Sequence, residues 1–379
     1  MKGFICKVIS VALAACMAIL SHAGEAPDSV FCKVLFKPGD AGSRFYRIPA
    51  LLTAADGSIV AAADKRNNNL GDLPNDIDVV CRRSTDMGAT WSDAVTIAGD
   101  GTATGYGDPA LVLDRRTGRI LCFMVSGNGF WQSNADDYQR LMLSVSDDNG
   151  LSWSAPRDIT PQIYGPACPD AERCKWLGAF FSSGNALQLS DGRIMIVIPT
   201  RLTPERGGKI SCYAVFSDDG GDTWGVSRNP GDFEGDEAKV VELSTGDVLM
   251  SIRNPKKGQR RFSISHDRGE TWGEAYCQPD IIEPACNGDI IRYRHGSRDF
   301  LLHSVPFDEK ERKNVSVLAS FDEGMTWRVR RTLVPGGSAY SSLAVLPDGS
   351  IGCFVEEGDY RRGFELKFMR FTPEWLLRE

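Results

Sequence analysis

Histidine is scarce in this chain, and long basic runs are missing from it. Four of the 379 residues are His, and no Cys-x-x-Cys pair or His/Cys cluster has the spacing of a zinc site. We therefore expect no metal and no cofactor. Asp and Glu outnumber Lys and Arg by 50 to 43. This balance gives no electrostatic basis for binding nucleic acid or an anionic membrane surface, so we expect neither partner.

Long apolar runs are also missing beyond the N-terminal segment, so we expect no membrane span in the mature chain. The N-terminal segment has the features of a secretory signal peptide, with two lysines, the apolar run Val8–Leu20 and then Ser21-His22-Ala23. We expect residues 1–23 to be removed and the protein to be secreted or periplasmic. Cys16 also fits a lipoprotein box, which leaves lipid anchoring there as the alternative.

The cysteine count leaves at least one thiol unpaired. Two of the 11 cysteines lie in the expected signal peptide, and the nine others cannot all pair within one chain. Cys168 with Cys174, and Cys277 with Cys286, flank short loops and are candidates for local disulfides in an oxidising compartment. For the remaining cysteines, a buried thiol that packs as a small hydrophobic side chain is an equal alternative.

Long amphipathic helix patterns are absent, and short β-type runs take their place. Examples are Ile194–Ile198 and Val248–Ile252, which are bounded by turn residues. Asp-Gly pairs at 56–57, 191–192 and 348–349 each precede an apolar stretch, as expected of hairpin turns. The sequence therefore predicts an all-β fold.

Five copies of one turn motif are the strongest signal in the sequence. Each copy reads Ser-x-Asp-x-Gly-x-Thr/Ser-Trp, and the copies start at Ser84, Ser146, Ser217, Ser265 and Ser320. In such a tight hairpin, Asp bonds forward to backbone amides, Gly takes a positive φ and Trp packs back on the strands. Copies about 50 to 70 residues apart predict sheet units repeated around an axis.

Together with these repeats, Tyr46-Arg47-Ile48-Pro49 resembles the signature of bacterial exo-sialidases, whose pattern is Phe/Tyr-Arg-Ile-Pro plus several such boxes. The resemblance implies a six-bladed β-propeller over residues 30–379, with the boxes on the face opposite the catalytic residues. A propeller commonly closes by pairing strands from its two ends, and Phe364–Phe371 is a suitable closing strand.

The resemblance implies three arginines that grip the carboxylate of sialic acid. They fall on Arg47, Arg253 and Arg312, although Arg292 and Arg298 lie close enough to compete with Arg312. Guanidinium groups are planar and permanently charged, so they suit a carboxylate ligand.

The resemblance also places the catalytic groups. Tyr340 falls at the nucleophile position, Glu237 at that of its base and Asp72 at that of the acid/base catalyst, with Asp76 and Asp78 as nearby competitors. Sialidases are an exception to the glycosidase pattern of two carboxylates. A neutral tyrosine avoids repulsion by the substrate carboxylate, but it needs a base and nearby positive charge to attack. Asp72 has to be protonated to act as an acid, so we expect its pKa to be raised.

Further residues match supporting positions of the family. Arg66 matches an arginine that contacts the oxygens of the sugar, and Asp108 an aspartate near the N-acetyl and hydroxyl groups. Glu356 matches the carboxylate that orients the first arginine, with Glu357 as the alternative one residue away. Phe130 and Trp131 are candidates for an apolar wall against the acetyl methyl, or for core packing.

The resemblance thus implies an exo-α-sialidase that removes terminal sialic acid from sialylated glycans through a covalent sialyl-tyrosine intermediate. Two alternatives stay open. An intramolecular trans-sialidase would use the same residues and differ in its product. A non-catalytic binding propeller would have no physical reason to keep the set Arg47, Arg253, Tyr340, Glu237 and Asp72.

Overall fold

The computed structural model describes residues 29–204 and 209–378. The expected signal peptide (1–23) and the alternative lipid attachment site at Cys16 lie outside the described residues.

Four of the sheets are small, and their bounds follow in chain order. The first contains β2 (Phe45–Thr53), β3 (Ile59–Arg66), β4 (Ile77–Ser84) and β5 (Val95–Ala98). The second contains β6 (Tyr106–Leu113), β7 (Ile120–Gly127), β8 (Gln139–Ser146), β9 (Arg157–Asp158) and β11 (Gly184–Asn185). The third contains β10 (Gly178–Ala179), β12 (Leu187–Gln188), β13 (Ile194–Arg201), β14 (Ile210–Ser217) and β15 (Gly225–Val226). The fourth contains β16 (Ala238–Glu242), β17 (Val248–Ile252), β18 (Gly258–Ser265) and β19 (Tyr276–Glu283).

The last sheet has seven strands. They are β20 (Asp289–His295), β21 (Arg298–Pro306), β22 (Lys313–Ser320), β23 (Val329–Val345), β24 (Ile351–Asp359), β25 (Gly363–Phe371) and β1 (Phe31–Phe36). The first part of β23 pairs with β22 and its second part with β24. Two four-stranded units are therefore joined through β23. Five sheets are thus defined by hydrogen bonding, and a count of six blades requires dividing this sheet at β23.

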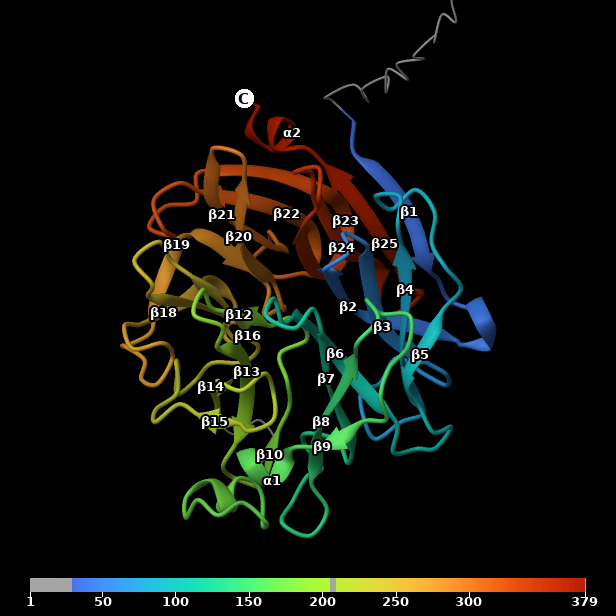
Figure 1. Cartoon of the computed structure of the whole chain (residues 1–379). Coiled ribbons are helices and arrows are strands. Elements are labelled where there is room, and N and C mark those ends of the chain that lie inside the picture. The colour runs from blue at the N-terminus through green and yellow to red at the C-terminus, as the bar shows by residue number, and fades with distance from the viewer. Residues whose placement is uncertain (1–28, 205–208, 379) are drawn as a thin grey trace, which may run out of the picture.

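The sheets lie around a common centre in chain order (Figure 1). Strands β2, β6, β16, β20 and β23 are innermost; β2 contacts β6 and β23, and β20 contacts β16 and β23. The apolar faces of adjacent sheets pack together, as where Leu51 and Ala61 of the first sheet meet Phe354 and Phe368 of the last. The fold is the predicted all-β propeller.

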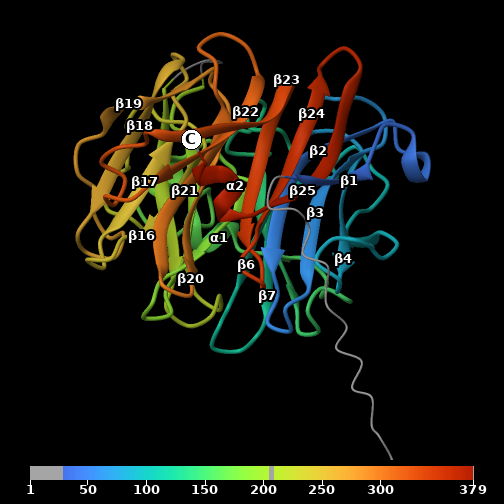
Figure 2. The ribbon, with the colours of Figure 1, turned by 90° about the horizontal axis from the view of Figure 1, so that it is seen from above.

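The ring closes between the two ends of the described chain. Strand β1 pairs antiparallel with β25, from Phe31 opposite Arg370 to Phe36 opposite Leu366 (Figure 2). The expectation that Phe364–Phe371 forms the closing strand is confirmed.

Helices are few. Two short α-helices, α1 (Thr160–Ile163) and α2 (Pro373–Leu377), and two 3-10 turns at Asp40–Gly42 and Arg173–Lys175 are present in the described residues. None of the helices found there is long and apolar enough to cross a membrane.

The five repeated turns share one hydrogen-bond pattern. In the first, Thr90 donates through its amide and its hydroxyl to Asp86, and the Gly88 amide donates to the Ser84 hydroxyl over 2.9 Å. Each repeat begins at the last residue of the third strand of its unit. Arg47 lies near the start of the first strand of the first sheet, and Arg66 lies at the end of the second strand, so both are at the other end of the strands from the repeat. The repeats therefore lie at the opposite end of the strands from these arginines.

The two expected disulfides are wrong. All nine described cysteines are free thiols. Cys286 is buried beneath Tyr340, whereas Cys277 is exposed at the start of β19, so the short separation in sequence does not bring the two together. Cys168 is likewise buried while Cys174 is partly exposed, and the Cys174 thiol donates to the carbonyl of Ala171.

Candidate active site

Three innermost strands are irregular where the candidate site lies. The pairing register shifts between Arg47 and Ala50 in β2, between Gly107 and Ala110 in β6, and between Ser338 and Ser341 in β23. Arg47 is the last paired residue before the first bulge, and Asp108 and Tyr340 lie within the other two. A bulge re-aims a side chain relative to the regular pleat, so each of these residues can point to the centre of the ring.

Two of the bulges place non-glycine residues at positive φ, with Ile48 at 61° and Asp108 at 57°. This conformation is strained for a β-branched residue such as Ile48. Carboxylates from neighbouring strands hold both segments in place. The Ile48 amide donates to Glu356 and the Asp108 amide donates to Asp64, each over 2.9 Å.

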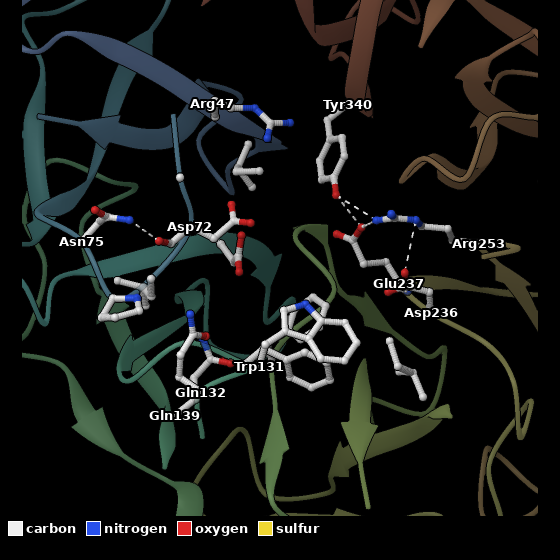
Figure 3. Close-up of a pocket in the computed structure, with 18 of the residues that line it drawn as sticks. Arg47, Asp72, Asn75, Trp131, Gln132, Gln139, Asp236, Glu237, Arg253 and Tyr340 are labelled. Atoms are coloured by element: carbon white, nitrogen blue, oxygen red, sulfur yellow. Dashed lines mark hydrogen bonds and ion pairs between the residues drawn. The ribbon is translucent and has the colours of Figure 1, made fainter. Parts of the chain in front are cut away.

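A pocket of about 670 Å³ opens at this end of the strands. Arg47, Arg253 and Arg312 all line it. Tyr340 and Asp72 line it as well, from opposite sides (Figure 3). The competitors of Arg312 point elsewhere, since Arg292 pairs with Glu323 and Arg298 with Glu374.

Arg47 is held by Glu356. Both groups are buried, and Glu356 accepts from Nε over 2.9 Å and from Nη2 over 3.0 Å. Burial alone would lower the pKa of Arg47, but the charge of Glu356 outweighs this effect and raises the pKa well above its ordinary value. Glu357, the alternative, instead pairs with Lys367 on the surface.

Arg312 has different partners. It donates to the carbonyl of Ala285 over 3.0 Å and to the hydroxyl of Tyr360. The Tyr360 ring centre lies 5.6 Å from the Arg312 guanidinium carbon and 4.9 Å from that of Arg47. An aromatic face near both guanidinium groups stabilises two cations that lie close together.

Tyr340, Glu237 and Arg253 form one hydrogen-bonded group. The Tyr340 hydroxyl donates to Glu237 Oε2 over 2.5 Å, and Arg253 Nη1 lies 2.5 Å from the same carboxylate oxygen and 3.2 Å from the hydroxyl. Figure 3 shows the hydroxyl pointing at this pair. Burial, followed by the charge of Glu237, raises the pKa of Tyr340 well above its ordinary value, and the two nearby arginines oppose the shift. The phenol is neutral, with an acceptor in place for its proton.

Asp72 lies across the pocket from this group (Figure 3). Its side chain is 78% exposed and pairs with Arg66 over 2.8 Å. Partial enclosure raises its pKa, but the charges of Arg66 and Arg47 outweigh that effect and lower it. The expected raised pKa of Asp72 is therefore wrong. The competitors do not line the pocket, since Asp78 contacts Lys65 in the β3–β4 ladder and Asp76 accepts from Asn67.

Arg66 and Asp108 are both close to Asp64, a residue that sequence reasoning missed. Asp64 Oδ2 accepts from Arg66 Nε over 3.1 Å and Nη2 over 2.9 Å, while Oδ1 accepts from the Asp108 amide. Burial, together with the charges of Asp64 and Asp72, raises the pKa of Asp108 well above its ordinary value. The sequence does hold a signal for Asp64, because an acidic residue directly follows the apolar strand run Ile59–Ala63.

Two other pocket residues were also missed. Asp236 lies 3.3 Å from Arg253 Nε, and Tyr360 lies between two arginines as described above. Asp236 adjoins Glu237 in sequence, which is a weak signal, and nothing in the sequence marks Tyr360.

The opposite wall of the pocket is apolar. Phe130 packs edge-on against Trp131 and Phe180, with ring centres 5.0 and 4.9 Å apart, and all three line the pocket. Phe130 and Trp131 therefore lie in an apolar wall of the pocket, which is the first of the two alternatives that the sequence offers for them.

Comparisons with known proteins agree on one family. The model of a BNR repeat-like domain matches residues 59–353. A sialidase of Micromonospora viridifaciens is 32% identical over 98% of this chain and 60% of its own length, and a sialidase of Paraclostridium sordellii is 32% identical over 83% and 82%. The chain spans about three fifths of the length of the first curated relatives.

Solved structures show the same fold. A Hadza microbial sialidase superposes with a TM-score of 0.83 at 28% identity, covering 92% of this chain and 69% of that one. The intramolecular trans-sialidase of Ruminococcus gnavus gives a TM-score of 0.76 at 20% identity, covering 91% and 98%, which shows a common fold alone. The chain belongs to the bacterial sialidase family with BNR repeats.

Proposed function

We propose that this protein is an exo-α-sialidase that hydrolyses terminal sialic acid from sialylated glycans through a covalent sialyl-tyrosine intermediate. The observation that carries the proposal is the group of Tyr340, Glu237 and Arg253, in which a neutral phenol donates over 2.5 Å to a carboxylate beside a guanidinium. A carboxylate nucleophile would be repelled by an anionic substrate, and a phenol is not.

Binding begins with the carboxylate at C2 of the substrate. In the proposal, Arg47, Arg253 and Arg312, which all line the pocket, donate to it. This contact places C2 next to the Tyr340 oxygen, because Arg253 donates to that oxygen as well. Orientation of this kind supplies much of the rate enhancement of an enzyme before any bond changes.

Asp72 becomes an acid only once substrate is bound. The carboxylate of the substrate offsets the charge of the arginines that lower the Asp72 pKa, and the leaving group covers the exposed face of Asp72. Both effects favour the protonated form.

In the first step, the Tyr340 oxygen forms a bond to C2 as its proton passes to Glu237. The bond from C2 to the leaving oxygen breaks, and Asp72 donates its proton to that oxygen. In the second step, Asp72 accepts a proton from water, whose oxygen attacks C2, and Tyr340 leaves and recovers its proton from Glu237. Two inversions at C2 give net retention.

The test uses purified mature protein, a fluorogenic α-sialoside and Tyr340→Phe as the matched variant, which lacks only the hydroxyl. We expect release of free sialic acid by the parent and near-complete loss in the variant. Proton NMR of early product should show the α-anomer, and a β-anomer formed first would exclude the double displacement. A product lighter than sialic acid by one water would instead identify intramolecular transfer.

A further inference from the structure

A second, smaller cavity adjoins the catalytic pocket. It measures about 390 Å³ and shares Trp131, Ile210 and Asp236 with that pocket. Its remaining walls, which are Lys209, Glu234, Pro255 and Lys256, do not line the catalytic pocket. We call this cavity the side pocket. Since three residues belong to both cavities, a substrate seated in one can extend into the other.

The far end of the side pocket is built around an ionised triad. Glu234 lies 2.7 Å from the Lys256 ammonium and 3.2 Å from that of Lys209. Each ammonium has three N–H donors, so donors remain on both lysines for a ligand oxygen after Glu234 is satisfied. The triad carries a net charge of one positive unit. Apolar surface from Trp131, Ile210 and Pro255 lies beside it.

The part of the substrate that reaches the side pocket follows from its chemistry. With the C2 carboxylate on the arginines, the acetyl methyl at C5 needs apolar contact, which the wall of Phe130, Trp131 and Phe180 offers. C4 and C6 then lie to either side of that wall. The flank at Arg66 is closed, because the Arg66 side chain is buried and pairs with Asp64 and Asp72. The flank at Ile210 and Asp236 opens into the side pocket, so C6, which carries the three-carbon glycerol chain, faces the open flank.

The leaving group does not compete for this space. Its oxygen must lie beside Asp72, and Asp72 is across the pocket from Asp236 (Figure 3). Asp72 and its partner Arg66 are not part of the side pocket wall.

We propose that the glycerol chain enters the side pocket past Trp131 and Asp236, and that the far end accepts an acyl group on its terminal C9 hydroxyl. This inference rests on the proposed sialidase function. An exo-enzyme meets a terminal residue whose glycerol chain bears no further sugar, so an acyl ester is the substituent to be accommodated. Its methyl contacts Ile210 and Pro255, and its carbonyl oxygen accepts from Lys256 or Lys209.

The test compares two fluorogenic α-sialosides, one unsubstituted and one with an acetamido group in place of the C9 hydroxyl, which cannot migrate or hydrolyse as an ester does. For the parent protein we expect kcat/KM values within about threefold of each other. A loss of more than about tenfold for the C9-substituted compound would overturn the inference while leaving the proposed function intact. Failure on both compounds would refute the proposed function, and the inference with it.

The variant Lys256→Trp fills the far end of the side pocket, and Lys33→Trp, at an exposed position in β1, is the matched control. We expect Lys256→Trp to lower the ratio of kcat/KM for the C9-substituted over the unsubstituted compound by about tenfold or more, and the control to leave it unchanged. An unchanged ratio in Lys256→Trp would overturn the inference. The inference would also be overturned if Lys256→Trp changed the ratio of kcat/KM for substrates with aryl and lactose leaving groups, because the side pocket would then hold the leaving group.

Discussion

Glu356 offers a sharp test of how the site is held together. Its carboxylate is fully buried and accepts from Arg47 Nε and Nη2, from the Ile48 amide and from the Tyr340 amide over 3.1 Å. One side chain therefore fixes a substrate-binding arginine, the strained bulge in β2 and the backbone of the proposed nucleophile. In Glu356→Gln, all four donors lose a charged acceptor, and two of them then face the NH2 of the amide, which cannot accept. Arg47 remains a cation that is only 4% exposed.

The magnitude follows from the burial of this pair. Breaking a buried ion pair by removing one charge costs about 3 to 5 kcal/mol, because the remaining charge is left without a partner. We expect Glu356→Gln to lower the free energy of unfolding by about 3 kcal/mol, since the amide keeps the shape of the side chain. Displacement of Arg47 and Tyr340 should also lower kcat/KM by about a hundredfold.

The neighbouring residue is the control. Glu357 differs by one position, is 40% exposed and pairs with Lys367 over 2.9 Å. A surface pair contributes about 0 to 1 kcal/mol, so Glu357→Gln should unfold close to the parent in urea and keep its activity. Equal losses of stability in the two variants, or full activity in Glu356→Gln, would refute the reasoning.

Four further predictions concern single residues. Asp72→Asn should lower kcat/KM by about a hundredfold or more on alkyl sialosides but far less on aryl sialosides, whose leaving groups need little protonation, and equal losses on both would argue against an acid role. Arg312→Gln should raise KM by about tenfold or more with a smaller change in kcat, as measured on the fluorogenic substrate. Burial raises the pKa of Asp64 to about 6, so stability should fall as pH rises from about 4 through 6, by up to about 3 kcal/mol, and urea unfolding of Asp64→Asn should lack that decline. Asp322→Ala should cost about 1 to 2 kcal/mol of stability at the last repeat while KM stays constant, and a raised KM would contradict a purely structural role.

The repeats and the closing strand could be predicted because their signals lie within short segments of the sequence or recur along it. A box of Ser, Asp, Gly and Trp makes its own turn, and five copies fix the sheet units around it. The disulfide prediction failed for the converse reason. Whether Cys277 and Cys286 meet depends on where β19 ends relative to the centre of the ring, and their nine-residue separation does not encode that position.

The candidate site was predictable as a set of residues but not as an electrostatic arrangement. The positive φ of Ile48 and Asp108 depends on acceptors 308 and 44 residues away in sequence, namely Glu356 and Asp64. The direction of the Asp72 pKa likewise depends on arginines that meet only in three dimensions. Resemblance to a family supplied the identities of these residues, and the structure supplied their charges and partners.

The balance of charge among the three arginines assigns them different parts in binding. Arg47 is neutralised by Glu356, and Arg253 is close to both Glu237 and Asp236. Arg312 forms no ion pair within residues 29–204 and 209–378, and its partners there are a carbonyl and a phenol. An incoming carboxylate is therefore attracted chiefly by Arg312, since the charges of the other two are already offset. Arg47 and Arg253, which are fixed by their carboxylates, then orient the bound group without having to reorganise, so attraction and alignment of the substrate are supplied by different residues.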